Sequence, residues 1–137
     1  MSRRDYYHKI VRQALTDEGW HITDDPYYFE SDPELSTDLG AERIIAAERN
    51  TEKIAVEIKS FLNDSQVYDL QRAIGQYGLY EELLILEEPE RVLYLAVPKY
   101  AFDNIFARQV GRIAIRKFNL RLIVYGSEGE ALRWIKP

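Results

Sequence analysis

The spacing of apolar residues changes several times along the chain, and each change marks a helix or a strand. Between residues 5 and 18 apolar side chains recur every three or four positions, which predicts a helix that ends at Gly19. The same spacing from 65 to 86 predicts a second helix, with Ser65 in the position of an N-cap. A third helical region is expected at about 100–118.

Shorter apolar runs without helical spacing predict strands, and they alternate with the helices. The run at 91–97 is ended by Pro98, which cannot continue a ladder of backbone hydrogen bonds. The expected strands are a short one beginning at 20–22, then 44–47, 53–59, 91–97, 120–125 and a short final one at 132–135. This order predicts an α/β fold, in which helices flank a mixed sheet within a single domain.

The strand at 53–59 alternates strictly, so Glu57 and Lys59 project from the same face. Glu42 lies just before the preceding strand, and Asp38 lies four residues earlier. If the two strands pair as a hairpin, an acid near the start of the first lies beside Glu57 near the end of the second. Converging carboxylates of this kind can hold Mg²⁺ or Mn²⁺.

Such a metal site predicts the attack of an activated water on a phosphodiester, with the Lys59 ammonium stabilising charge in the transition state. A simpler interpretation also fits the pattern. Glu-x-Lys on one strand face is typical of any half-exposed hairpin with cross-strand charge pairs. Taken alone, the motif favours that simpler interpretation.

The helix at 65–86 adds a second feature. Arg72, Gln76 and Tyr80 recur at intervals of four, so they form one line beside its apolar stripe. Gln76 could bind a phosphate or a water molecule near the metal, and Tyr80 could stack on a sugar. Alternatively, Gln76 is simply exposed and Tyr80 packs in the core.

Composition excludes several classes of protein. With 137 residues, 46% hydrophobic and 30% charged, the chain suits a folded single domain and not a disordered segment. It contains no cysteine, which excludes disulfides, zinc–thiolate sites and thiol nucleophiles. No run approaches the roughly 20 apolar residues of a membrane span, so a cytoplasmic protein is expected.

Positive charge is concentrated in two segments, although the net charge is −5. The acidic average argues against a protein that coats nucleic acid nonspecifically. In residues 1–15 only Asp5 opposes the basic residues Arg3, Arg4, Lys9 and Arg12. In residues 98–121 only Asp103 opposes Lys99, Arg108, Arg112, Arg116, Lys117 and Arg121. Both segments could face a phosphate backbone or an acidic partner protein.

Three arginines of the second segment form a candidate DNA-binding stripe. Arg108, Arg112 and Arg116 recur every four residues, which gives a row about 12 Å long at the helical rise of about 1.5 Å per residue. A row of guanidinium donors suits the phosphate oxygens of DNA. It suits a protein partner equally well, and both alternatives stay open.

Several strings along the chain resemble those of the XisH family. The most specific is DLGAERIIAAE at 38–48, followed by KIAVEIKSF at 53–61. The others are DYYH at 5–8, DDPY at 24–27, GQY at 75–77, LYLAVP at 93–98 and LIVY at 122–125. The resemblance therefore extends over essentially the whole chain.

This resemblance implies a role in DNA rearrangement. XisH proteins are named as controlling factors for excision of the fdxN element in cyanobacteria, where they act alongside a site-specific recombinase. A small XisI protein is commonly encoded next to them. The family in turn resembles the PD-(D/E)XK nucleases, whose restriction-endonuclease-like fold is a mixed sheet flanked by helices.

The resemblance also implies roles for particular residues. Glu57 and Lys59 match the E-x-K pair of those nucleases, and Gln76 matches the glutamine of the helix that follows. The first metal ligand is either Asp38 or Glu42, because no Pro-Asp precedes the first strand of this sequence. Glu57 would be the other metal ligand.

Two functions of different classes are therefore expected. One is a Mg²⁺-dependent DNA endonuclease used during excision. The other is a non-catalytic accessory factor that binds DNA, the recombinase or an XisI-like partner. A homo-oligomer is compatible with either function.

Overall fold

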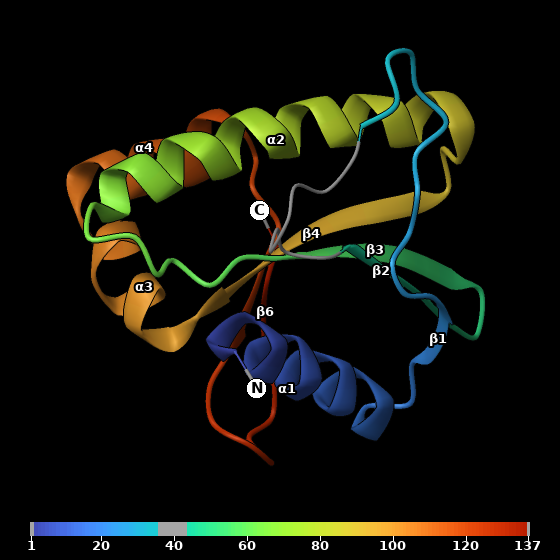
Figure 1. Ribbon diagram of the computed structural model, residues 1–137, viewed down its shortest axis with the longest axis horizontal. Coiled ribbons are helices and arrows are strands. Elements are labelled where there is room, and N and C mark those ends of the chain that lie inside the picture. Colours follow the sequence, from blue (N-terminus) through green and yellow to red (C-terminus); the bar gives the residue numbers. More distant parts are fainter. Residues whose placement is uncertain (1, 36–43, 137) are drawn as a thin grey trace.

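A six-stranded sheet runs through the centre of the computed structural model, which describes residues 2–35 and 44–136 (Figure 1). The strands lie side by side in chain order. The β3–β4 and β4–β5 pairs are parallel and the other pairs are antiparallel, so the predicted mixed α/β sheet is confirmed. The strands are β1 (His21–Asp24), β2 (Ile44–Arg49), β3 (Glu52–Ile58), β4 (Arg91–Pro98), β5 (Leu122–Tyr125) and β6 (Arg133–Ile135).

Helices cover both faces of this sheet. α1 (Arg3–Asp17) lies on one face, and α2 (Gln66–Glu87) crosses the other face (Figure 1). α3 (Lys99–Asp103), the 3₁₀ turn η1 (Ile105–Ala107) and α4 (Gln109–Lys117) follow β4 and share the apolar cluster beneath α2. Among the described residues, no helix combines the length and apolar character needed to cross a membrane.

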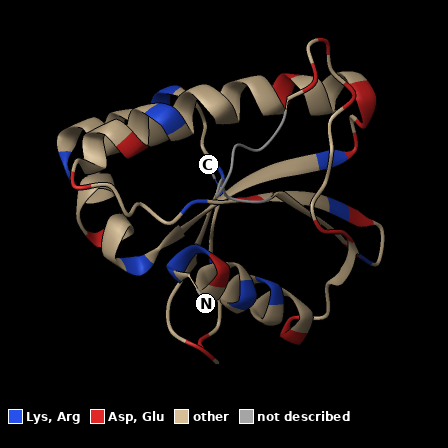
Figure 2. Ribbon diagram, in the orientation of Figure 1, with Lys and Arg blue, Asp and Glu red and all other residues tan. Residues whose placement is uncertain are grey.

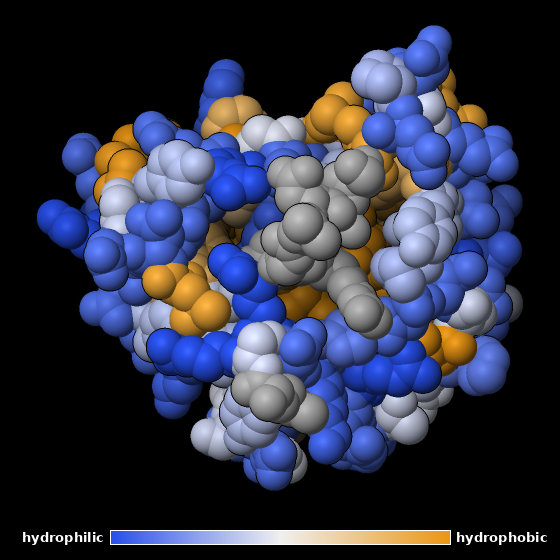
Figure 3. Space-filling model, in the orientation of Figure 1, coloured by the Kyte–Doolittle hydropathy of each residue, from blue (hydrophilic) through white to orange (hydrophobic). Residues whose placement is uncertain are grey.

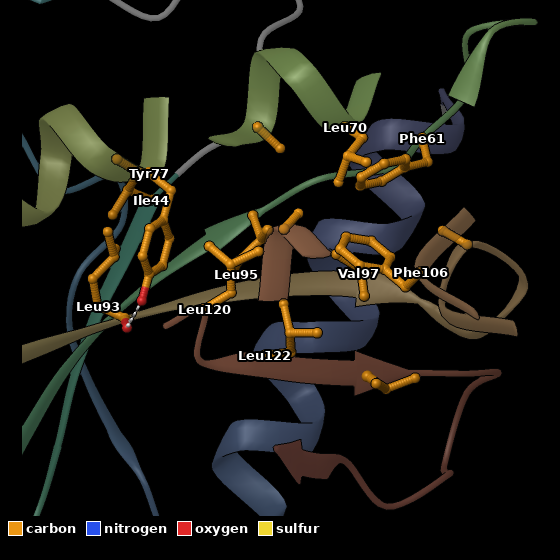
Figure 4. Close-up of a cluster of buried hydrophobic side chains, with 14 of the residues drawn as sticks. Ile44, Phe61, Leu70, Tyr77, Leu93, Leu95, Val97, Phe106, Leu120 and Leu122 are labelled. Atoms are coloured by element: carbon orange, nitrogen blue, oxygen red, sulfur yellow. Dashed lines mark hydrogen bonds between the residues drawn. The ribbon is translucent and has the colours of Figure 1, made fainter. Parts of the chain in front are cut away.

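Alternation along the central strands divides the core into two layers. Ile54, Val56 and Ile58 of β3 pack on the α1 side, whereas Ala55 packs on the α2 side. The side chains of β4 also alternate between the two layers. Its Leu93, Leu95 and Val97 belong to the cluster beneath α2 shown in Figure 4. Because β4 has parallel neighbours on both sides and helices on both faces, it is apolar almost throughout.

The predicted helix ends are close to the observed ones, and two caps explain where the long helices begin. The Ser65 hydroxyl accepts a hydrogen bond from the backbone N–H of Tyr68, as expected for the N-cap of α2. Ser2 caps α1 in the same way, through the N–H of Asp5. Gly19 follows α1 with a φ of 91°, a conformation that glycine adopts without strain.

The helical region expected at 100–118 is confirmed, but it consists of three short elements and not of one continuous helix. The chain forms α3, then η1, and then α4, which begins only at Gln109. Ile105 and Phe106 turn into the core, where they are 3% and 2% exposed, and α4 packs back against them. This close approach depends on Gly111, because a Cβ there would lie 2.1 Å from the Ile105 carbonyl oxygen.

We therefore expect Gly111→Ala to lower the free energy of unfolding by about 1–3 kcal/mol, the usual cost of overpacking a core. Gly78→Ala on α2 is the matched control, because nothing lies within 4 Å of its added Cβ. There the better helix propensity of alanine should stabilise the protein by up to about 1 kcal/mol. Urea denaturation of the two variants measures both effects, and equal stability of Gly111→Ala and the parent would contradict the packing argument.

Candidate functional site

The candidate site lies where β3 ends, beneath the first half of α2. Ile44 at the start of β2 pairs with Glu57 near the end of β3, which confirms the antiparallel hairpin on which the predicted site depended. Glu57 follows Ala55 by two residues and so points to the same side of the sheet, toward α2. Its side chain is only 1% exposed, so a carboxylate is buried inside the fold.

Lys59 connects this carboxylate to α2. Its Nζ lies 3.6 Å from the Glu57 Oε2 and donates a hydrogen bond to the Gln76 Oε1. The structure therefore brings together the three residues for which sequence predicts catalytic roles. A buried carboxylate is costly unless charge and hydrogen bonds compensate it, and the Lys59 ammonium supplies part of that compensation.

The backbone of Lys59 is held as firmly as its side chain. Its N–H donates to the Ala96 carbonyl oxygen at 2.9 Å, and its own carbonyl oxygen accepts from the Tyr125 hydroxyl at 2.7 Å. The Tyr100 hydroxyl donates to the carbonyl oxygen of the next residue, Ser60. The segment after β3 is thus fixed by β4, β5 and α3, and the ammonium is positioned by the core.

The line of residues predicted on α2 has three different roles. Gln76 contacts Lys59, whereas the Tyr80 ring stacks on Phe29 at 4.9 Å between centroids, so Tyr80 contributes to packing. Arg72 lies near the N-terminal end of α2, with its guanidinium 5.8 Å from the Tyr68 ring centroid. The regular spacing correctly predicts that the three side chains share one side of α2. The role of each side chain depends on the residues that it contacts.

A pocket of about 280 Å³ opens beside Lys59. Among the described residues, the cationic side chains of Arg4, Lys59 and Arg72 line it together with one carboxylate, Asp69, which accepts from the Asn63 N–H at 3.0 Å. Its remaining lining residues are Phe61, Leu62, Asn63 and Tyr68. Strongly hydrophilic residues gather on this side of the molecule, between the first half of α2 and the start of α1 (Figure 3). The buried Glu57–Lys59–Gln76 cluster therefore meets solvent in a cationic pocket.

The predicted metal ligands can be assessed only in part. Asp38 and Glu42 lie outside the described residues. In the ranges 2–35 and 44–136, no group of three or more His, Asp or Glu side chains is placed to hold a metal ion. Glu57 has the oxygen donor that Mg²⁺ prefers, and its burial beside an ammonium suits a ligand of low mobility. The chemistry of this one donor fits the metal, and the rest of the ligand set stays a prediction.

The arginine stripe is separate from this pocket. Arg108 caps α4 from an extended backbone conformation, and its carbonyl oxygen accepts from the Arg112 N–H at 3.0 Å. Arg108, Arg112 and Arg116 are all exposed, and none of them lines the pocket beside Lys59. A ligand bound at Lys59 would therefore not have to reach α4.

Sequence reasoning missed the residues that complete the site from other parts of the chain. Arg4 belongs to a basic segment that is visible in the sequence, but nothing in the sequence places it beside Lys59. Tyr100 belongs to no motif and Tyr125 only ends the LIVY string, although the hydroxyls of both fix the backbone at 59–60. The abundance of tyrosine was the only available signal, since buried tyrosines need hydroxyl partners.

The same arrangement of elements occurs in known proteins. The family model described as XisH protein matches residues 1–133. The chain belongs to the XisH family. A crystal structure of an XisH family protein from Nostoc punctiforme PCC 73102 is 37% identical, with a TM-score of 0.87, and the match covers 96% of this chain and 100% of that one.

A second solved structure is similar to the same degree. It is the crystal structure of a fdxN element excision controlling factor protein from Anabaena variabilis, with 38% identity and a TM-score of 0.86. That match covers 96% of this chain and 99% of the other. No curated protein matches the chain. The XisH fold therefore extends over nearly the entire sequence.

The contact between Glu57 and Lys59 can be measured with a double-mutant cycle. Glu57→Gln and Lys59→Met should each lower the free energy of unfolding by about 1–3 kcal/mol, because each leaves a polar partner in a mostly buried place. The double variant should lose roughly 1 kcal/mol less free energy of unfolding than the two single variants lose in sum, since the two side chains interact. Additive losses in urea denaturation would show that the two groups do not interact.

Proposed function

We propose that this XisH-family protein has a metal-dependent DNA endonuclease core of the PD-(D/E)XK type and acts in the excision of a DNA element. The observation that carries the proposal is the Lys59 ammonium, which contacts the buried Glu57 carboxylate and the Gln76 amide at the edge of a cationic pocket. The similarity to the fdxN element excision controlling factor protein from Anabaena variabilis supports the role in excision.

The arrangement of elements also supports this core. The β2–β3 hairpin is followed by α2, which leads to the parallel strand β4, so the E-x-K strand lies next to the centre of a mixed sheet. Glu57 and Lys59 lie where the parallel strands β3 and β4 end. In α/β proteins, ligands commonly bind at this edge of the sheet. The restriction-endonuclease-like assignment rests on this topology together with the E-x-K pair.

Each residue of the cluster would have a distinct task. When bound, Mg²⁺ or Mn²⁺ would polarise the scissile phosphodiester and acidify a bound water. Glu57 would hold the ion, together with Asp38 or Glu42. Lys59 would stabilise the negative charge that develops on phosphate oxygens, and Gln76 would orient the ammonium by accepting a hydrogen bond from it.

Cleavage tests the proposal directly. With Mg²⁺ or Mn²⁺ the protein should cut duplex, nicked or branched DNA, and both Glu57→Ala and Lys59→Ala should lower the rate by roughly 100-fold or more. Gln76→Ala should have a smaller effect, because it acts through the lysine.

The same strand supplies a matched control. Glu52 and Lys53 lie at the opposite end of β3, where both side chains are substantially exposed. Glu52→Ala and Lys53→Ala should therefore leave cleavage unchanged. Absence of cleavage by the parent protein, or cleavage that persists in Glu57→Ala and Lys59→Ala, would refute the proposed activity.

A second function is favoured by the surface of α4. Val110, Ile113 and Phe118 are exposed on or beside this helix, next to the three arginines of the stripe. Apolar side chains bordered by arginine are typical of protein contacts. The alternative is therefore an accessory factor that binds an XisI-like protein or the recombinase through α4, with DNA as a further candidate ligand.

Co-expression with an XisI-like protein tests this second function. The complex should survive size-exclusion chromatography, and combined Arg108→Ala, Arg112→Ala and Arg116→Ala should weaken it by about tenfold or more, because arginines at interfaces are common hot spots. DNA binding by the triple variant should be measured in parallel. If both the complex and DNA binding survive the triple substitution, the stripe has neither role.

A further inference from the structure

A second groove, lined by tyrosines, lies next to the candidate site. It has a volume of about 340 Å³, and its aromatic lining residues are Tyr6, Tyr7, Tyr100 and Tyr125. The ring centroids of Tyr6 and Tyr7 are 6.0 Å apart, and those of Tyr7 and Tyr125 are 5.6 Å apart. Tyr6, Tyr7 and Tyr125 therefore form a row of contacting rings that runs from the exposed Tyr6 to the buried Tyr125.

This tyrosine groove and the cationic pocket border the same segment of backbone. Lys59 and Phe61 line the pocket, while the hydroxyls of Tyr125 and Tyr100 bond the carbonyl oxygens of Lys59 and Ser60. The first turns of α1 contribute to both hollows, with Arg4 in the pocket and Tyr6 and Tyr7 in the groove. One extended ligand could therefore occupy both.

The hydroxyl groups of three tyrosines are engaged with the protein. Besides the two contacts to the 59–60 backbone, the Tyr7 hydroxyl accepts from the Arg3 guanidinium at 3.3 Å. Burial raises the pKa of Tyr100 well above its usual value, so its hydroxyl remains a protonated donor to Ser60. These bonds fix the rings, and the accessible aromatic surface of the groove comes from the exposed Tyr6 and the half-buried Tyr7 and Tyr100.

Charge differs between the two hollows in a way that suits the two parts of a nucleotide. The pocket has three cations against the Asp69 carboxylate, which favours phosphate. Among the described residues that line the tyrosine groove, one cation, Lys99, is balanced by one carboxylate, Glu130, and the Arg3 guanidinium lies beside it on the Tyr7 hydroxyl, so its lining is less cationic than that of the pocket. Figure 2 shows lysine and arginine at the start of α1, at the end of β3 and at the start of α3, around this end of the sheet.

We propose that the tyrosine groove binds the bases of an unpaired DNA strand whose phosphates occupy the cationic pocket beside Lys59. Single-strand binders combine these two elements, a basic track for the backbone and aromatic rings on which successive bases stack. In a duplex the base faces are already stacked and cannot reach the tyrosines. The assignment rests on the proposed nuclease function in taking DNA as the ligand, and it would make that nuclease selective for single-stranded or branched substrates.

Binding in EDTA tests this assignment without any cleavage. The probe is a fluorescent oligothymidine of about 12 nucleotides, within the site sizes of single-strand binders, and its blunt duplex with oligoadenosine is the comparison. Fluorescence anisotropy should show the single strand bound at least about tenfold more tightly than the duplex. Comparable affinity for the two, or tighter binding of an oligouridine RNA of equal length, would overturn the proposal.

Variants locate the binding to the groove. Tyr6 is 39% exposed, so Tyr6→Ala should weaken single-strand binding by about tenfold, while Tyr6→Phe should retain affinity because the ring carries the stacking. Tyr28 is 68% exposed and lies outside the groove lining, so Tyr28→Ala is the matched control. Unchanged affinity of Tyr6→Ala would overturn the assignment.

The outcome is separable from that of the proposed nuclease. If the protein binds the single strand through Tyr6 but never cleaves DNA, the groove stands and the nuclease proposal fails. If Glu57-dependent cleavage occurs without preference for single strands, the nuclease proposal stands and the assignment of the tyrosine groove fails.

Discussion

The contact on which this site depends is that of the Lys59 ammonium with a buried carboxylate and an amide. Glu57 is almost completely removed from solvent, and a carboxylate in such a place is expensive unless other groups compensate its charge. Lys59 lies 3.6 Å away on the same strand face, and Gln76 accepts a hydrogen bond from it across the gap to α2. The three residues thus tie β3 to the helix above it. Since the Lys59 backbone is also bonded to Ala96 and Tyr125, the ammonium moves only if the sheet does.

The location of this cluster follows from the sheet. The central strands are apolar on both faces because helices cover them. Polar side chains of a functional site therefore lie near the ends of these strands. β3 and β4 are parallel and end together, and Glu57 and Lys59 lie at that edge. Charge is distributed accordingly. Basic segments surround this end, whereas acidic residues gather at the opposite end, around the end of α2 and the β2–β3 turn (Figure 2). A protein of net charge −5 can therefore still present a cationic pocket to a phosphate.

The local parts of this arrangement were predictable from the sequence, and the long-range parts were not. Strict alternation at 53–59 correctly places Glu57 and Lys59 on one face, and the hairpin with β2 on which the predicted site depended is confirmed. The break between α3 and α4 was missed because helical spacing continues through it; the break depends on burial of Phe106 and on the absence of a Cβ at Gly111, which are tertiary effects. Arg4 and Tyr100 were missed as site residues for the same reason, since each meets the 59–60 segment only after the sheet has formed. Asp38 and Glu42 lie outside the described residues. The prediction that one of them is the first metal ligand therefore rests on the sequence alone.

The energetics of the cluster bear on whether its role is structural or chemical. Replacing a buried ion pair with apolar residues of similar size is often neutral or stabilising, so stability alone gives little reason for Glu57 and Lys59 in a sheet that is otherwise apolar. Membership of the XisH family fixes the fold but not the chemistry, because one fold can hold unrelated functions. The position of the cluster is more informative. A purely structural ion pair could lie anywhere along β3, as the pair of Lys53 with Glu48 does at its other end, whereas Lys59 lines an open pocket together with Arg4 and Arg72. The proposed binding of a phosphate with its metal ion would use both charges of this cluster, the buried Glu57 carboxylate and the Lys59 ammonium that lines the cationic pocket.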